Sequence, residues 1–307
     1  MDKIYDMAVI GGGPGGYTAA LYAARAGMDV VVLEKLSPGG QMALTARVDN
    51  YPGFDQGIDG FTLGENMRRG AERFGAKTVL VEVLSLDLNP VPKRIETSAG
   101  TFYAQTVVYA AGAGPRELGV PGEAELAGKR VHYCAACDGM FYKGKHVVVV
   151  GGGNSAAADA CLLSRVAEKV TIVHRRDTLR AEKSSCAPLL EAKNVEFCWN
   201  STVTGLRLQG DRVELALQNV TTGEETVLLV DGVFVSIGRK PATELVAGQL
   251  ALDPAGYLPA DESTRTQIPG VFAVGDVRTK AVRQIVTAAA DGAAAVHFAQ
   301  EHLAGKH

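Results

Sequence analysis

The 307-residue sequence predicts an α/β fold in which one strand–helix–strand unit is inserted into another. A strand pattern that runs into a glycine-rich turn and then a helix occurs twice, at residues 7–16 and again at 147–156. The chain also breaks at two glycine-containing segments, 112–116 and 238–241, which predict linkers. Its length fits about two domains, and 47% hydrophobic residues are enough for two cores.

The first unit is predicted on both sides of the insertion. Before it, the patterns predict a helix at 17–26 and strands at 7–10, 30–33, 79–88 and 106–110. The helix is rich in alanine and stops at Gly27, a residue common after helix ends. After the insertion, an apolar strand at 271–276 ends in Gly275-Asp276, and an alanine-rich helix covers 283–303.

The second unit repeats the beginning of the first. Strands are predicted at 147–150 and 170–173, with a helix between them. Alternating apolar and polar residues then predict further strands at 202–208, 212–218, 226–230 and 233–237.

Each unit carries the glycine spacing of a dinucleotide-binding loop. Gly11, Gly13 and Gly16 have the full G-x-G-x-x-G spacing, and Ala156 takes the third position in the second unit, which the fingerprint allows. Such glycines let the backbone turn tightly and bring N–H groups at a helix N-terminus to a pyrophosphate. Alone the spacing is weak evidence, but here a strand, a helix and a second strand accompany it.

The two units differ in charge where their second strands end. The spacing from Gly11 to Glu34 equals the spacing from Gly151 to His174, but the second strand is followed by Arg175 and Arg176. An acid at this place hydrogen-bonds ribose hydroxyls, whereas arginines accommodate a 2′-phosphate. The sequence therefore predicts two dinucleotides of different kinds; a solvated basic turn is the alternative for the arginines.

A dithiol motif lies just ahead of the second unit. Cys134 and Cys137 are separated by two residues, a spacing that lets the sulfurs close a disulfide. Half of a zinc site is the alternative, but no second C-x-x-C or histidine cluster accompanies it, so no metal is predicted. Asp138 follows directly and is a candidate proton donor and acceptor for thiol–disulfide exchange. A solvated turn aspartate is the alternative.

Composition argues against several other classes. A net charge of −3 and a pI near 6.1 give no reason to expect nucleic acid or an anionic membrane as partner. No stretch of 18 apolar residues predicts a membrane span, and the N-terminus lacks a signal-peptide pattern. Five cysteines, an odd number, suit a reducing compartment, and a cytoplasmic location is expected.

On these motifs the chain resembles the bacterial low-molecular-weight thioredoxin reductases over nearly all of its length. The motifs that carry the resemblance are 11–20 (GGGPGGYTAA), 39–41 (GGQ), 50–54 (NYPGF), 134–139 (CAACDG), 174–177 (HRRD) and 275–277 (GDV) with 283–284 (RQ).

The resemblance implies two Rossmann-like domains of the three-layer ββα type. Residues 1–114 and 242–307 would form an FAD-binding domain, and 115–241 an NADPH-binding domain that carries the dithiol. It also implies a hinge near 113–116 and 238–241, a homodimer, and thioredoxin or a thioredoxin-like small redox protein as partner.

The resemblance assigns roles to individual residues. Cys137 would be the sulfur nearer the flavin, Cys134 the one that attacks the partner's disulfide, and Asp138 the acid–base group. The FAD-binding residues would be Gly11, Gly13, Pro14, Gly16, Glu34, Gly39, Gly40, Gln41, Asn50, Val83, Gly112, Gly275, Asp276, Arg283, Gln284 and Ile285. The NADPH-binding residues would be Gly153, Asn154, Ser155, Ala156, His174, Arg175, Arg176 and Arg180.

The function expected is that of a thioredoxin-disulfide reductase, which passes electrons from NADPH through FAD to the Cys134/Cys137 pair. A dithiol oxidase or a ferredoxin-linked disulfide reductase on the same scaffold is the alternative, although neither needs a 2′-phosphate site. A flavodoxin or ferredoxin–NADP reductase would lack the cysteine pair. A nucleotide-sensing module without turnover is the alternative outside the enzymes.

Overall fold

The computed structural model describes residues 3–45 and 47–305. Met1 and Asp2, which begin the segment searched for a signal-peptide pattern, therefore lie outside the described residues. The chain forms two units. One contains the residues up to Gly114 together with those from Lys240 onward, and the other is Pro115–Arg239. The second boundary between the units follows Arg239, two residues before the predicted boundary after residue 241. It falls within one strand, β16 (Arg239–Pro241). This strand pairs with β7 (Ala113–Pro115), so the two predicted linkers are short paired strands.

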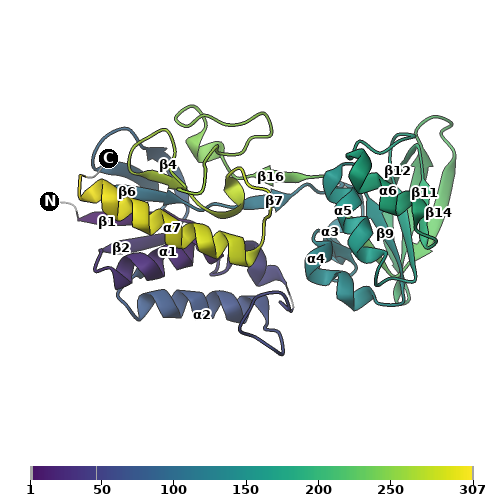
Figure 1. Cartoon of the computed structure of the whole chain (residues 1–307), viewed down its shortest axis with the longest axis horizontal. Coiled ribbons are helices and arrows are strands. Elements are labelled where there is room, and N and C mark those ends of the chain that lie inside the picture. Colours follow the sequence, from purple (N-terminus) through teal and green to yellow (C-terminus); the bar gives the residue numbers. More distant parts are fainter. Residues whose placement is uncertain (1–2, 46, 306–307) are drawn as a thin grey trace. The chain divides into compact units, whose positions relative to one another are not determined.

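The first unit is built on a seven-stranded sheet with the order β3-β2-β1-β6-β5-β4, in which β17 also pairs with β6. Its strands are β1 (Ile4–Ile10), β2 (Val30–Glu34), β3 (Lys77–Leu80), β4 (Val83–Asp87), β5 (Lys93–Thr97), β6 (Gly100–Tyr109) and β17 (Val271–Ala273). Its helices are α1 (Pro14–Arg25), α2 (Gly60–Glu72) and α7 (Ile285–Leu303), with 3₁₀ turns η1 (Gly40–Leu44), η3 (Glu244–Val246) and η4 (Gly275–Val277). Figure 1 shows α1 between α7 and α2.

Alternate residues of the central strands face two different cores. Met7 and Val9 of β1 pack with the alanines of α1 and α7, whereas Ala8 and Ile10 pack on the opposite face. That second face is covered by β4, β5 and the segment that contains η3. Because both faces are buried, these strands read as continuous apolar runs.

The second unit has a five-stranded parallel sheet, β11-β10-β9-β15-β8, and an antiparallel sheet, β12-β13-β14. The strands are β8 (Val131–His132), β9 (His146–Val150), β10 (Lys169–Val173), β11 (Val195–Cys198), β12 (Ser201–Gln209), β13 (Arg212–Asn219), β14 (Glu225–Val230) and β15 (Gly232–Val235). The helices are α3 (Glu123–Leu126), α4 (Ala135–Asp138), α5 (Asn154–Leu163) and α6 (Lys183–Glu191), and η2 (Gly139–Tyr142) follows α4.

The three layers predicted for this unit are present. Val148 and Val150 of β9 pack against the antiparallel sheet, whereas Val147 and Val149 pack against α5 and α6. The parallel sheet therefore lies between a layer of helices and a layer of strands, which confirms the ββα fold.

Two helices begin at different residues from those predicted. Helix α1 starts at Pro14 rather than at residue 17, because proline's fixed φ and missing N–H suit the first helical position. Helix α7 starts at Ile285, after Gln284, whose N–H donates to Thr287 Oγ1 at 3.1 Å. No helix among the described residues is long and apolar enough to cross a membrane.

Candidate functional site

The first glycine loop joins β1 to α1 in a conformation that requires glycine. Gly11 has φ +101°, and a Cβ there would lie 2.6 Å from the carbonyl oxygen of Ala110. A Cβ on Gly16 would overlap the carbonyl oxygen of Gly11. At Gly13, by contrast, no heavy atom lies within 4 Å of the place of a Cβ. The loop is thus packed tightly where it meets the sheet and open at the N-terminus of α1, as a pyrophosphate requires.

The predicted acid lies at this loop. Glu34 Oε2 accepts a hydrogen bond of 2.6 Å from the N–H of Gly12, and Oε1 accepts one of 3.0 Å from the N–H of Leu36. A carboxylate has about four acceptor positions, so two such bonds leave capacity for a ribose.

Two further predicted segments reach the same region. The N–H of Gly39 donates to the carbonyl oxygen of Gly12 at 2.8 Å, and a Cβ on Gly40 would lie 3.5 Å from Gly13 Cα. Ile285 packs into the small core beneath η1 that contains Met42.

Three of the remaining FAD candidates have side-chain contacts, and the others are located by their elements. Asn50 Nδ2 donates to Gln284 Oε1 at 3.1 Å. The Arg283 guanidinium lies 4.1 Å from the centroid of the Tyr257 ring. The others are Gln41, exposed in η1; Val83, half-buried at the start of β4; Gly112, with φ +74°; and Gly275 and Asp276, in η4.

The second glycine loop repeats the first. The N–H of Gly151 donates to the carbonyl oxygen of Val173 at 3.0 Å, as that of Gly11 does to Leu33 at 2.9 Å. Gly153 is open, with no heavy atom within 4 Å of the place of a Cβ. Three predicted NADPH residues follow it: Asn154, whose Oδ1 accepts from the N–H of Glu182 at 2.9 Å; Ser155, which is exposed; and Ala156, which is buried.

His174 occupies the place that corresponds to Glu34, but it lies under the loop. Its ring fills the space where a Cβ on Gly152 would be, and only 5% of its surface is exposed. Nε2 has no hydrogen-bond partner among the described residues. Burial, and then the positive charges of Arg180, Arg175 and Arg176, lower the pKa of His174, so the ring is neutral at pH 7.

The three arginines are all exposed beside this histidine. The N–H of Arg180 donates to the carbonyl oxygen of Gly152 at 2.7 Å, and the carbonyl oxygen of Arg176 accepts from the N–H of Asn200 at 3.1 Å. Within the described part of the chain, no carboxylate forms an ion pair with Arg175, Arg176 or Arg180. Three exposed guanidinium groups next to an open glycine loop are suited to an anionic group such as phosphate.

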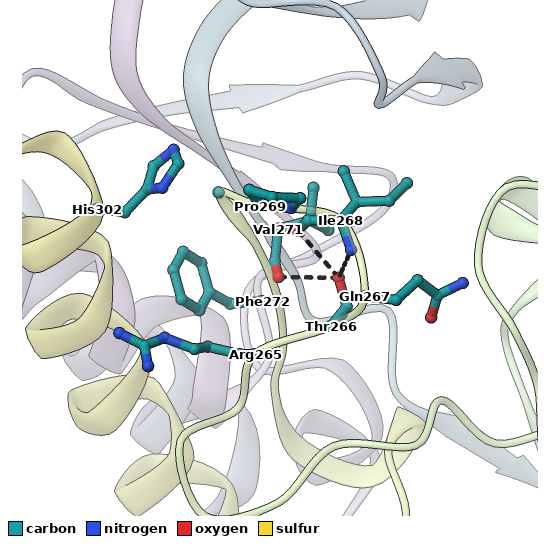
Figure 2. A pocket seen from close by; sticks show the side chains of 9 residues that line it. Arg265, Thr266, Gln267, Ile268, Pro269, Val271, Phe272 and His302 are labelled. Carbon is teal, nitrogen blue, oxygen red and sulfur yellow. Dashed lines mark hydrogen bonds between the residues drawn. The ribbon is translucent and has the colours of Figure 1, made fainter. Parts of the chain in front are cut away.

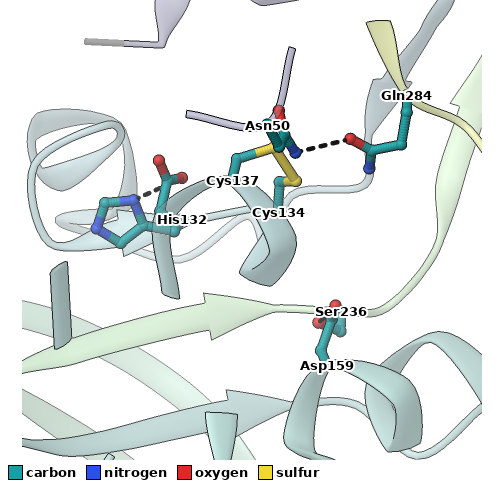
Figure 3. The surroundings of a disulfide bond; sticks show 8 residues. Asn50, His132, Cys134, Cys137, Asp159, Ser236 and Gln284 are labelled. Atoms are coloured by element: carbon teal, nitrogen blue, oxygen red, sulfur yellow. Dashed lines mark hydrogen bonds and ion pairs between the residues drawn. A yellow bond between two sulfur atoms is a disulfide. The ribbon is translucent and has the colours of Figure 1, made fainter. Parts of the chain in front are cut away.

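The two cysteines of the dithiol motif form a disulfide. Cys134, the N-cap residue of α4, is bonded to Cys137 within that single helical turn, and their Cα atoms are 5.3 Å apart (Figure 3). The N–H groups of Cys137 and Asp138 both donate to the carbonyl oxygen of Cys134, at 3.2 and 3.1 Å. Just before the motif, the hydroxyl of Tyr133 donates to Glu123 Oε1 at 3.0 Å and so anchors the approach to Cys134.

Four side chains around these features were not predicted from the sequence. Asp138 Oδ2 lies 3.0 Å from Nδ1 of His132, whose Nε2 lies 2.7 Å from the hydroxyl of Tyr142. Near the second glycine loop, Ser236 Oγ donates to Asp159 Oδ2 at 2.5 Å, and burial raises the pKa of Asp159. A histidine on the strand that leads into Cys134 was the one available signal.

A separate cleft of about 250 Å³ lies in the first unit around the loop 265–272 (Figure 2). None of the predicted site residues lines it. Thr266 Oγ1 donates to the carbonyl oxygen of Val271 at 3.0 Å, and Arg265 pairs with Glu301 of α7 at 2.9 Å, so these two side chains hold the segment 265–272 in place.

Comparison with known proteins agrees with this architecture. Residues 5–292 match the family described as pyridine nucleotide-disulphide oxidoreductase. The thioredoxin reductase of Listeria monocytogenes is 44% identical over 98% of this chain and 95% of its own length. That of Streptomyces coelicolor is 45% identical over 99% of this chain and 95% of its own. The crystal structure of the thioredoxin reductase from Streptococcus pyogenes superposes with a TM-score of 0.91 at 40% identity, covering 99% and 100% of the two chains.

Proposed function

Because the chain belongs to the thioredoxin reductase family of pyridine nucleotide-disulphide oxidoreductases, we propose that it is an NADPH-dependent flavoprotein that reduces the disulfide of thioredoxin. The observation that carries the proposal is the Cys134–Cys137 disulfide, built into a unit that also holds a dinucleotide loop with exposed arginines beside it. The partner would be thioredoxin itself or a thioredoxin-like small redox protein.

The first unit fits FAD. The open position at Gly13 and the hydrogen-bonded carboxylate of Glu34 suit a pyrophosphate and a ribose. The segment 39–41 adjoins the same loop, and Asn50 and Gln284, bonded to each other, would contribute amide groups. The other candidates retained are Gly11, Pro14, Gly16, Val83, Gly112, Gly275, Asp276, Arg283 and Ile285.

The second unit fits NADPH. Gly153, Asn154, Ser155 and Ala156 would present the start of α5 to the pyrophosphate. Arg175, Arg176 and Arg180 would hold the 2′-phosphate, while His174 supports the loop from below. When both cofactors are bound, they supply the hydride chemistry that keeps the cysteine pair reduced.

The exchange with the partner follows from the chain's own residues. The Cys134 thiolate attacks one sulfur of the partner's disulfide, and the sulfur released takes a proton from Asp138. The thiol of Cys137 then gives its proton to Asp138 and attacks Cys134, so the second partner sulfur leaves and takes that proton. Two electrons and two protons reach the partner, and the Cys134–Cys137 disulfide is restored.

The protein is further proposed to act in the cytoplasm as a homodimer. The odd number of cysteines, with a single disulfide between Cys134 and Cys137, suits a reducing compartment. Light scattering of the purified protein would test the dimer.

An anaerobic titration with NADPH tests the function. A disulfide in series with a two-electron cofactor holds four electrons, so we expect about two equivalents of NADPH to be consumed. Oxidised thioredoxin should then recover the oxidised spectrum. The variant Cys134→Ser/Cys137→Ser should consume about one equivalent and transfer nothing to thioredoxin.

Four results would contradict the proposal. Consumption of one equivalent by the wild-type protein, without recovery by thioredoxin, would remove the cysteine pair from the path. Reduction by small dithiols but not by NADPH would favour a dithiol oxidase, and reduction by ferredoxin alone a ferredoxin-linked enzyme. A purified protein that binds both dinucleotides without turnover would be a sensor.

A further inference from the structure

Strand β8 places a histidine two residues before the redox-active pair and holds its ring firmly. His132 is 6% exposed. Its ring stacks on Phe234 with centroids 5.3 Å apart, and it meets the edge of Tyr142 at 5.2 Å. Phe234 is the register partner of His132 on β15, so the sheet itself fixes this stack. Packing against these two rings therefore orients the His132 ring in addition to its hydrogen bonds.

Both nitrogens of this ring have polar partners. Nδ1 lies 3.0 Å from Asp138 Oδ2, and Nε2 lies 2.7 Å from the hydroxyl oxygen of Tyr142 (Figure 3 draws the bond from His132). The Tyr142 hydroxyl also reaches the carbonyl oxygen of Lys129 at 3.4 Å. A chain of three side chains thus runs from the carboxyl group beside Cys137 into the interior of the unit.

The series Asp138–His132–Tyr142 can keep the Asp138 carboxyl group hydrogen-bonded with or without its proton. When Asp138 is a carboxylate, Nδ1–H donates to Oδ2 and the Tyr142 hydroxyl donates to Nε2. When Asp138 holds a proton, its O–H donates to Nδ1, Nε2–H donates to the Tyr142 oxygen, and the hydroxyl turns to the carbonyl of Lys129. The second state contains one proton more, the one that Asp138 receives. Histidine allows both states because its neutral ring has two tautomers.

Burial and the charged groups around Tyr142 leave its phenol group neutral. Burial raises the pKa of Tyr142, although the nearby Arg130 opposes this, and Asp138 and Asp231 also raise it. Lys145 lies over the Tyr142 ring at 5.5 Å. Tyr142 therefore keeps its proton between pH 6 and 9 and can change only the direction in which it donates.

We propose that His132 is a positioning residue for Asp138: it keeps the Asp138 carboxyl group hydrogen-bonded in both protonation states during thiol–disulfide exchange. This proposal rests on the function proposed above. The Asp138 side chain is 19% exposed, so water alone does not satisfy it. A partner that could only donate would stabilise the carboxylate and oppose the protonated form. A tautomeric partner favours neither state, which suits a group that must accept and return a proton in each cycle.

The test compares two disulfide substrates on the holoenzyme. Single-turnover reduction of thioredoxin by the NADPH-reduced protein is followed by quenching and thiol alkylation between pH 6 and 9. A nitroaromatic disulfide, whose thiolate leaves without a proton, is the second substrate. We expect His132→Phe to slow the reaction with thioredoxin about tenfold and the reaction with the nitroaromatic disulfide less than about twofold.

Three further variants sharpen the result. In an Asp138→Asn background, His132→Phe should add less than about a twofold loss, because both changes remove one function. His132→Asn should restore part of the rate and flatten its pH dependence, since an amide can donate to Asp138 but has no second tautomer. The matched control is His146→Phe, since His146 is a half-buried histidine bonded to Thr171 at 2.9 Å in the same sheet, and its rates should not change.

FAD content and thermal unfolding show whether each variant is folded. If His132→Phe does not fold, His132→Gln replaces it, because glutamine can still reach Tyr142 but not Asp138. It should show the same loss of rate with thioredoxin and not with the nitroaromatic disulfide. Two results with His132→Phe would overturn the role of His132: an unchanged rate with thioredoxin, or an equal loss of rate with both substrates. So would a double variant, His132→Phe with Asp138→Asn, whose loss of rate equals the product of the two single losses. A wild-type protein that does not reduce thioredoxin at all would instead overturn the proposed function.

Discussion

Arg175 and Arg176 are exposed at the end of β10, where no described carboxylate neutralises them. Each charge-assisted bond to a phosphate is worth about 1.5–3 kcal/mol. We expect Arg175→Ala/Arg176→Ala to weaken NADP⁺ binding by about two orders of magnitude and to leave NAD⁺ binding nearly unchanged. Trp199, the single tryptophan, lies 6.4 Å from His174 between ring centroids, so its fluorescence reports binding. Arg165→Ala, an exposed arginine in the same unit, is the control; an equal loss for both nucleotides would contradict the 2′-phosphate site.

Asp291 is the centre of a buried ion cluster beneath η4. It pairs with Arg278 at 2.6 Å and Lys280 at 2.7 Å, and it accepts from the N–H of Gly275 at 2.9 Å. Burial alone would raise its pKa, but these partners outweigh it and hold the pKa below the usual 3.8. Asp291→Asn should cost about 3–5 kcal/mol in free energy of unfolding, because two buried cations lose their partner. Glu301→Gln, in an exposed pair with Arg265, should cost less than about 1 kcal/mol.

The same cluster predicts how the free energy of unfolding changes at acid pH. Because the folded pKa of Asp291 lies below the unfolded one, its contribution is present above about pH 4 and is lost as the pH falls through the folded pKa. Urea unfolding between pH 3 and 6 should therefore show a shallower pH dependence for Asp291→Asn than for the wild-type protein. Parallel curves would mean that Asp291 does not titrate in this range.

At the scale of elements, the contact between α1 and α7 depends on two glycines. A Cβ on Gly15 would lie 2.6 Å from Val274 Cγ1 and 2.9 Å from the carbonyl oxygen of Ala288. A Cβ on Gly292 would overlap the carbonyl oxygen of Gly15. We expect Gly292→Ala to lower the free energy of unfolding by about 1–3 kcal/mol, because the helices must separate.

The misplaced helix should also weaken cofactor retention, since α1 begins at the first glycine loop. The control is Gly70→Ala in α2, where no heavy atom lies within 4 Å of the new Cβ. It should raise stability by about 0.5–1 kcal/mol through helix propensity. Similar losses for Gly292→Ala and Gly70→Ala in chemical unfolding would show that close packing is not the cause.

Elements with a local signature could be predicted from the sequence, and contacts between elements could not. The apolar runs and glycine turns predicted β1, β9 and the helices after them, and the C-x-x-C spacing predicted the disulfide. The pairing of β7 with β16 was missed, because it joins segments far apart in sequence. The contact of His132 with Tyr142 was missed for a related reason: two short helical turns that were not predicted, α4 and η2, bring the two side chains together.

At the scale of the whole molecule, each unit has hydrophobic cores of its own. The clusters around β1 and β6 contain only residues of the first unit, and those around β9 and β15 contain only residues of the second. Units with separate cores can gain stability separately when a ligand binds one of them. The assignment of NADPH to the unit Pro115–Arg239 can therefore be tested without catalysis.

Hydrogen exchange measured by mass spectrometry on the FAD-loaded protein provides this test. NADP⁺ at a hundredfold its dissociation constant stabilises the form that binds it by about 2.7 kcal/mol. We expect added protection in peptides from 115–239, above all around Gly153 and Arg175, and little change in peptides from 4–114 and 240–303. NAD⁺ at the same concentration should protect far less, since it lacks the phosphate that the arginines would hold. Equal protection in both units would mean either that NADP⁺ binds the first unit as well or that the whole chain unfolds cooperatively. Either result would remove the basis for assigning one dinucleotide to each unit.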